Sequence, residues 1–237
     1  MKKITVFIAI IFSMVTVFAQ TKQLDEKSAF YIYMKGSNTI LSADDELDYA
    51  KSFETATYQK YRNDEFEWDE QFSNIKQSLK TKIAEADMHS TYTIVTTLEF
   101  GDFDFTNEGF PITINAGTFF PFNYFNNWVD FKRTSLFYKR IALKLDSFDK
   151  YNFFAMPKDE AKAFLQGRKN SYGTVNRKVT LQINYKIAAF DSDEYNNFKD
   201  LALSNNYLPI VGIIENIDVY DTSNTKNIKK IGELVQK

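Results

Sequence analysis

The spacing of the apolar residues changes near residue 88, and this change constrains the fold more than any other feature of the chain. Before it, apolar side chains recur every three or four residues and so share one face of a helix: Trp68, Phe72, Ile75, Leu79 and Ile83. After it, apolar and polar residues alternate from Tyr92 to Phe100, as in a strand with one buried side. A helical stretch followed by strands predicts an α+β fold.

The helical stretch is predicted to run from Ala43 to Ala86. Ser42 is a suitable N-cap, and Asp45 occupies the capping-box position three residues later. The dipeptide Asn63-Asp64 is the point at which this stretch could divide into two helices. We therefore expect an N-terminal long helix or helix pair, packed through its apolar face on a sheet.

The second part of the chain is predicted to form a mainly antiparallel β-sheet or sandwich with short helical insertions. The clearest strand runs from Lys178 to Ile187, with Gln182 and Asn184 on its polar, water-facing side. In another strand, 136–145, Lys144 is expected to face outward. The other expected elements are a return strand at 110–118, helices at 157–165 and 193–204, a strand at 209–220, and a last short strand or helix at 227–235.

The apolar pattern of the strand 209–220 changes its facing partway along. Ile210 and Ile214 occupy even positions, whereas Ile217 and Val219 occupy odd ones. One extra residue restores the facing, so we expect a β-bulge near Glu215-Asn216.

The first 19 residues have the pattern of an export signal. Two lysines precede an apolar run, and small residues at Val17 and Ala19 are spaced for cleavage between Ala19 and Gln20. The alternative is a membrane anchor, but the run is shorter than the ~20 residues that a spanning helix needs. We expect an exported protein, periplasmic or extracellular, without a transmembrane segment after cleavage.

The remaining chain is predicted to be a single α+β domain, residues 20–237, with a mainly helical layer at 20–88 and a mainly antiparallel sheet at 89–237. Residues 29–34 fit either a short helix or an edge strand. The chain contains no cysteine, so packing of its 23 Phe, 14 Tyr and 2 Trp must hold the fold.

The charge balance argues against a nucleic-acid partner. The chain has 29 Lys and Arg, of which the leader holds 2, leaving 27 against 31 acidic residues, a net charge of −4. A protein that binds nucleic acid through general electrostatics would be basic.

Recognisable catalytic motifs are missing from the sequence. His89 is the only histidine, which excludes the usual zinc ligand sets in a chain without cysteine. We therefore predict no cofactor and no metal. The acidic run 64–70 fits a cation site or, more simply, a solvated helix face. The segment 101–109 fits a Ca²⁺ loop or, more simply, a polar hairpin turn.

The segment 119–131 is the candidate ligand-binding site. It combines aromatic rings with amide side chains, the groups that line sugar and peptide sites, and the candidate residues are Phe122, Tyr124, Asn126, Asn127 and Trp128. The alternative is a loop that covers one end of the sheet. A modest basic patch could follow it, formed by Lys132, Arg133, Lys139, Arg140 and Lys144.

Five phrases together resemble an uncharacterised family of exported bacterial proteins, known as a domain of unknown function. They are DEFEW (64–68), GDFDFTNEGFPI (101–112), MPKDEAKAFL (156–165), RKVTLQINYKI (177–187) and IENIDVYD (214–221). The resemblance spans most of the chain after the leader. It implies export and a shared architecture, and it carries no activity or site.

These observations favour a non-enzymatic binding or structural module of the bacterial cell envelope, with a glycan, a peptide or an envelope protein as its partner. Two alternatives stay open. A hydrolase acting on glycans needs only two carboxyl groups at a suitable separation in a cleft. An accessory or inhibitor protein could instead bind a partner by edge-strand addition.

Overall fold

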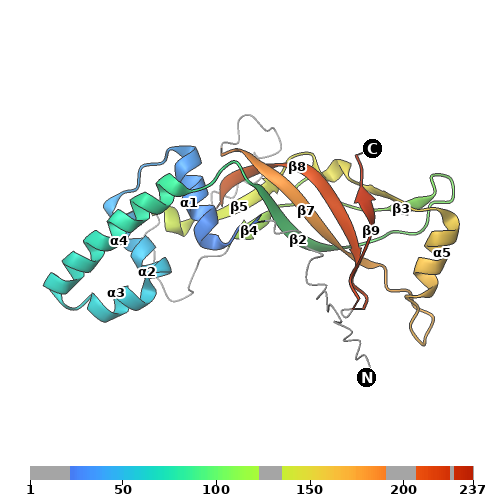
Figure 1. Ribbon diagram of the computed structural model, residues 1–237, viewed down its shortest axis with the longest axis horizontal. Coiled ribbons are helices and arrows are strands. Elements are labelled where there is room, and N and C mark those ends of the chain that lie inside the picture. Colours follow the sequence, from blue (N-terminus) through green and yellow to red (C-terminus); the bar gives the residue numbers. More distant parts are fainter. Residues whose placement is uncertain (1–21, 123–134, 191–206, 225–226, 237) are drawn as a thin grey trace, which may run out of the picture.

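The computed structural model describes residues 22–122, 135–190, 207–224 and 227–236. These residues form five α-helices, a seven-stranded mixed sheet and a two-stranded sheet, which confirms the predicted α+β class (Figure 1). The helices are α1 (Glu26–Ser37), α2 (Ala43–Phe53), α3 (Thr55–Tyr61), α4 (Glu65–Glu85) and α5 (Lys158–Gln166). The strands are β1 (Lys22–Gln23), β2 (Thr91–Glu99), β3 (Gly109–Pro111), β4 (Phe120–Phe122), β5 (Arg140–Leu145), β6 (Phe153–Ala155), β7 (Lys178–Ala189), β8 (Tyr207–Asp221) and β9 (Lys229–Leu234).

Side-chain caps define where the N-terminal helices begin. The predicted capping box of Ser42 and Asp45 is present at the start of α2. The predicted break at Asn63-Asp64 is also present, because Asp64 accepts hydrogen bonds from the backbone of Phe66 and Glu67 and so starts α4. A second interruption, at Glu54, separates α2 from α3. Residues 29–34, which fitted either a helix or a strand, belong to α1.

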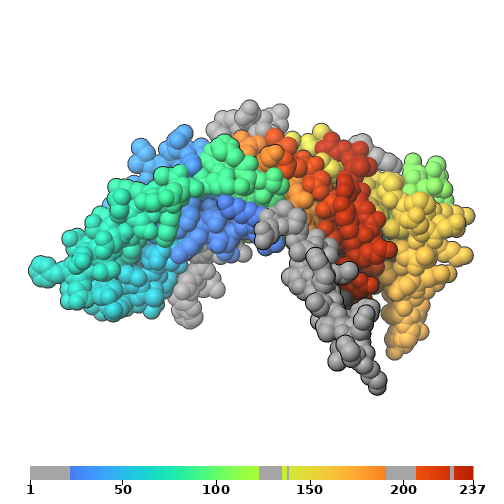
Figure 2. Space-filling view, in the orientation of Figure 1, coloured from blue at the N-terminus to red at the C-terminus, as the bar shows by residue number. Residues whose placement is uncertain are grey.

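The apolar stripe of α4 packs on helices, and this corrects the expected partner. Figures 1 and 2 show α2, α3 and α4 as an arm that extends beyond one end of the sheet. In this arm α4 contacts α1, α2 and α3, and Trp68 stacks on Phe72 at 5.1 Å between ring centroids. The helix that packs on the sheet is α1, which contacts β5 and β8.

The large sheet has the strand order β1-β2-β7-β8-β5-β4, with most neighbours antiparallel. Strand β8 is central to it: one side pairs with β7, and the other pairs first with β5, in parallel, and then with β9, antiparallel. The predicted bulge in β8 is confirmed, because Asn216 lies opposite Asn184 and Ile214 opposite Tyr185, which leaves Glu215 as the extra residue. The predicted C-terminal element is a strand, β9.

The expected return strand 110–118 is much shorter in the structure. Strand β3 ends at Pro111 and pairs with β6 as a separate small sheet. Ile112 forms only an isolated bridge with Phe100. The expected helix 193–204 lies outside the described residues.

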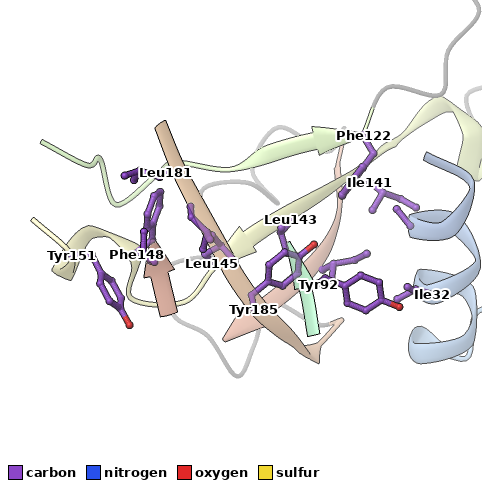
Figure 3. Close-up of a cluster of buried hydrophobic side chains, with 14 of the residues drawn as sticks. Ile32, Tyr92, Phe122, Ile141, Leu143, Leu145, Phe148, Tyr151, Leu181 and Tyr185 are labelled. Carbon is purple, nitrogen blue, oxygen red and sulfur yellow. The ribbon is translucent and has the colours of Figure 1, made fainter. Parts of the chain in front are cut away.

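Buried aromatic and aliphatic side chains from α1 and from the strands of the large sheet pack together in one core cluster. Figure 3 shows Ile32 of α1 near the rings of Tyr92 and Tyr185, with Leu143 and Leu145 of β5 beside them. The two tyrosine rings lie 6.1 Å apart. Burial raises the pKa of Tyr92 to about 12, so the ring stays neutral.

Three polar residues expected to face water are buried instead. Lys144 is 4% exposed, Gln182 2% and Asn184 9%. Their strands, β5 and β7, are interior strands of the sheet, with a neighbour on each side. Asn184 is satisfied there, because it accepts a hydrogen bond from Thr93 at 2.6 Å and donates one to Asn216 at 3.1 Å. Alternation with polar residues therefore predicted the strand correctly but not the exposure of its second face.

Candidate functional site

The candidate ligand-binding residues of the segment 119–131 are only partly described. Phe122 ends β4 opposite Ile141, is 9% exposed and belongs to the hydrophobic core. Tyr124, Asn126, Asn127 and Trp128 lie outside the described residues, as do Lys132 and Arg133 of the expected basic patch. Within that patch, Lys144 is buried rather than exposed.

The acidic run 64–70 lies on solvent-facing turns of α4. Asp64 is the N-cap, and Glu65, Glu67, Asp69 and Glu70 are exposed. Within the part of the chain that the structure describes, no three His, Cys, Asp or Glu side chains come together as a metal-binding group. The run is a solvated helix face with Trp68 on its inner side.

The segment 101–109 forms a polar hairpin turn, bridged between Asp104 and Gly109. The carboxylate of Asp104 accepts hydrogen bonds from the backbone of Thr106 and Asn107 and from the Asn107 side chain, at 2.6–3.0 Å. Asp102 pairs with Arg177 at 3.1 Å. These carboxylates therefore stabilise the turn itself.

His89 is exposed in the connection between α4 and β2. Its backbone N–H donates to Asp87 at 2.9 Å, and so does the backbone N–H of Ser90 at 3.1 Å. The Ser90 hydroxyl also donates to Asp87, and these bonds hold the pKa of the Asp87 carboxyl well below its ordinary value. His89 therefore lies in a turn that the Asp87 side chain stabilises through backbone hydrogen bonds.

A hollow lies between α5 and β9, gold and red in Figures 1 and 2, and we call it the α5–β9 groove. Its volume is about 410 Å³. Its apolar lining comes from Met156, Ala163, Phe164 and Ile231, and its polar lining from Glu160, Asp221, Lys229 and Lys230. Two other described hollows, beside α4, measure about 200 Å³ each.

Helix α5 forms one wall because both of its ends are fixed. Pro157 precedes its first turn, as predicted, and Ala161 is buried against the core. Beyond its C-terminus, the buried guanidinium of Arg168 lies 4.4 Å from the centroid of the Phe164 ring. This contact orients the ring that lines the groove.

Arg168 also joins the end of β8 to the start of β7 behind the groove. It pairs with Asp221 of β8 at 2.5 Å and donates to the carbonyls of Asn176 and Lys178, at 3.0 and 2.7 Å. Burial raises the pKa of the Asp221 carboxyl, but hydrogen bonds from Arg168 and Ser223 outweigh this and hold the pKa below its ordinary value. Asp221 is therefore a fixed anion.

Strand β9 forms the opposite wall and presents an open edge. One side of β9 pairs with β8, with an irregularity that leaves Ile231 unpaired. On its other side the described residues provide only a bridge between Val235 and Phe153. Lys230 pairs with Asp218 at 2.8 Å and with Glu233 at 2.6 Å, and these two acids raise its pKa. On the side away from β8, residues 229–231 therefore have no described strand partner where β9 borders the groove.

The groove contains two carboxyl groups, Glu160 and Asp221, which bears on the hydrolase alternative. Glycoside hydrolysis needs one carboxyl kept protonated in an apolar setting. Asp221 is held ionised by Arg168. Glu160 is exposed in the first turn of α5 and so lies in water, not in an apolar setting. The pair in this groove lacks the environment of a general acid.

Sequence reasoning did not find this groove, because its two walls are far apart along the chain. One local signal was available: Phe164 and Arg168 are only four residues apart in the sequence, close enough for the guanidinium to reach the ring at the end of α5. The pairing of β9 with β8, which completes the site, depends on contacts that no local pattern specifies.

No described helix combines the length and the apolar character that crossing a bilayer requires. Neither the curated proteins nor the solved structures contain a significant match to the chain. A family model does match, over residues 42–167, and its description is "Domain of unknown function (DUF4852)". The match runs from the capping box of α2 to Gly167 beyond α5, so it includes the helical wall of the groove and not β9. Because it covers more than half of the chain, the protein belongs to this family of unknown function, as the resemblance implied.

Proposed function

We propose that the protein is an exported, non-enzymatic binding module that takes up an extended peptide segment of another envelope protein in the α5–β9 groove. The observation that carries this proposal is an open strand edge beside a helix with an apolar face. Peptides bind such sites by adding a strand to the sheet.

The groove offers both kinds of contact that this mode needs. The peptide backbone would pair with the edge of β9 at residues 229–231, and alternate side chains would point into the floor formed by Phe164, Met156 and Ile231. The volume of about 410 Å³ is within the ~300–1,000 Å³ typical of ligand pockets. The groove is thus large enough for a few side chains of a peptide, and binding in this mode involves no catalytic step.

Charge in the groove favours a peptide with an acidic residue. Arg168 neutralises Asp221, and two acids neutralise Lys230. Lys229 is exposed on the rim, and the described residues provide it with no ion pair. A carboxylate on the ligand would complement Lys229, so we expect acidic-apolar sequences to bind best.

Export is supported by the leader pattern of residues 1–19. Cleavage between Ala19 and Gln20 would leave β1, which begins at Lys22, in the mature chain. A partner in the cell envelope follows from that location.

Arrays of peptides and glycans probed with the mature protein, followed by calorimetry on the best ligand, test the proposal. Ala163 is exposed on the groove wall, and Ala163→Trp fills the groove from α5. We expect this variant to lose at least tenfold in affinity at unchanged thermal stability. Gln166→Trp, on the same helix but outside the lining, is the matched control and should bind normally. Retention of full affinity by Ala163→Trp, or binding of glycans alone, would refute the peptide groove.

A further inference from the structure

The free edge of β9 ends where β6 begins to cover it. Within the described part of the chain, residues 229–231 have no strand partner on the side away from β8. Further along β9, Val235 forms a bridge with Phe153 of β6. The Phe154 ring packs so closely on Gly232 that a Cβ there would lie 2.8 Å from two ring carbons. Strand β6 therefore bounds the α5–β9 groove at this end.

Two unpaired charges lie at opposite ends of the groove. The chain passes from β6 into α5 through Met156, and Glu160 follows one helical turn later, so Glu160 lies near the β6 end. Lys229 is the first residue of β9 and lies opposite Asp221, at the far end from β6. Both side chains are exposed, and neither has an ion pair among the described residues.

A groove that is bounded in this way fits the end of a chain better than an internal segment. A strand that pairs with residues 229–231 and continues straight toward β6 would collide with it. An internal segment would have to turn out of the groove at that point. A terminal segment can stop there, and its terminal charge would then lie near Glu160.

Given the peptide binding proposed above, on which this step rests, we infer that the groove binds the free amino terminus of another exported protein. The terminal ammonium lies beside Glu160, and the segment runs antiparallel to β9. Strand β6 has this same direction relative to β9. Leader cleavage gives every exported protein a new amino terminus, so partners of this class are present in the envelope.

The charges at the β6 end decide between the two chain termini. A carboxy terminus there would place a carboxylate beside that of Glu160, and like charges repel. The first turn of α5 favours negative charge through the helix dipole, but Asp159 and Glu160 already supply two carboxylates to it. A terminal ammonium is the complementary group.

The same direction specifies where an acidic residue of the partner belongs. When the first residue of the bound segment lies opposite Ile231, its third residue lies opposite Lys229. Oppositely charged side chains that face each other on neighbouring strands attract. We therefore expect a glutamate or aspartate at the third position.

Peptide arrays probed with the labelled mature protein test the direction of binding. The probes are six-residue peptides with glutamate at the third position and Ala, Val, Thr, Leu or Phe elsewhere. Each sequence is attached through its carboxy end, with the amino terminus free or acetylated, and also through its amino end. At pH 6.5 a free α-amino group, with an ordinary pKa of ~7.7–8.0, is protonated. Acetylation should weaken binding at least fivefold, and attachment through the amino end should weaken it as much.

Glu160→Gln tests which side chain receives the amino terminus. In this variant the difference in affinity between free and acetylated peptides should shrink at least threefold. Asp159→Asn, in the same helical turn but outside the lining of the groove, is the matched control and should keep the full difference. Both residues are exposed, so we expect both variants to fold normally.

The possible failures of this inference differ from those of the peptide groove. Equal binding of free and acetylated peptides would overturn the preference for an amino terminus and leave the groove as a peptide site. Tighter binding of peptides attached through the amino end would overturn the direction. Equal discrimination by Glu160→Gln and Asp159→Asn would overturn the role of Glu160. Binding to no peptide in either attachment would refute the peptide groove and this inference together.

Discussion

At the scale of single residues, Arg168 is a buried side chain whose contacts hold two strands together. Its side chain is 1% exposed, yet it carries a charge that only Asp221 neutralises among the described residues. Its remaining donors bond to two backbone carbonyls, which belong to the segment leading into β7. The guanidinium is suited to this role because its planar fork can reach a carboxylate and carbonyls together.

Replacing Arg168 with methionine should lower the free energy of unfolding by about 3 kcal/mol, because it leaves Asp221 and two carbonyls without their donor. Chemical denaturation measures this change. Arg177→Met is the matched control: its partner Asp102 is 98% exposed, so we expect a loss of no more than about 1 kcal/mol. Equal losses in the two variants would show that burial of the Arg168 pair is unimportant.

Local residue chemistry could be predicted from the sequence, and long-range contacts of the same residues could not. The capping box of Ser42 and Asp45 was predicted because both partners lie within one helical turn. The other carboxylate oxygen of Asp45 accepts a hydrogen bond from the backbone of Leu136 at 2.7 Å, 91 residues away. No spacing rule predicts that contact, and the same reason explains why the Arg168–Asp221 pair was missed.

At the scale of elements, periodicity predicted where helices and strands lie better than it predicted what covers them. The stripe of α4 fixes an apolar face but not its partner, which is a group of helices instead of the sheet. The alternation in β7 fixes a strand, but Gln182 and Asn184 are buried on its polar side. The bulge in β8 could be predicted because the apolar residues of this strand change from even to odd positions within its own sequence.

Deleting Glu215 should therefore be tolerated, because the remaining residues keep their partners in β7 and both Ile214 and Ile217 keep their facing. The loss is the contact with Thr91 at 2.7 Å and an exposed ion pair with Lys186, and we expect a cost of about 1 kcal/mol in urea unfolding.

Deleting Ile213 is the matched control, two positions away. Once the strand absorbs that deletion by losing its bulge, Glu215 falls opposite Tyr185 on the core face. Burying an unpaired carboxylate should cost at least about 3 kcal/mol. If deleting Glu215 proved as costly as deleting Ile213, the bulge would have a role beyond restoring the facing.

At the scale of the whole molecule, the family match ends before the sheet is complete. The matched residues 42–167 contain the arm helices α2–α4, strand β2 and helix α5. The strands β7, β8 and β9, which complete the sheet and the second wall of the groove, follow the matched region. A functional site built from both parts needs the full chain, so we expect binding to depend on residues beyond the family's core.

The mature chain should begin at Gln20 after export, because small residues at Val17 and Ala19 suit cleavage after Ala19. Intact mass spectrometry of the protein from the periplasm of an expressing bacterium should match residues 20–237. Ala19→Tyr places a bulky ring at the cleavage position and should leave the leader attached, whereas Phe18→Tyr, its neighbour, should be processed normally. Recovery of the unmodified protein from the cytosol with Met1 still in place would contradict export and, with it, the envelope partner that we propose.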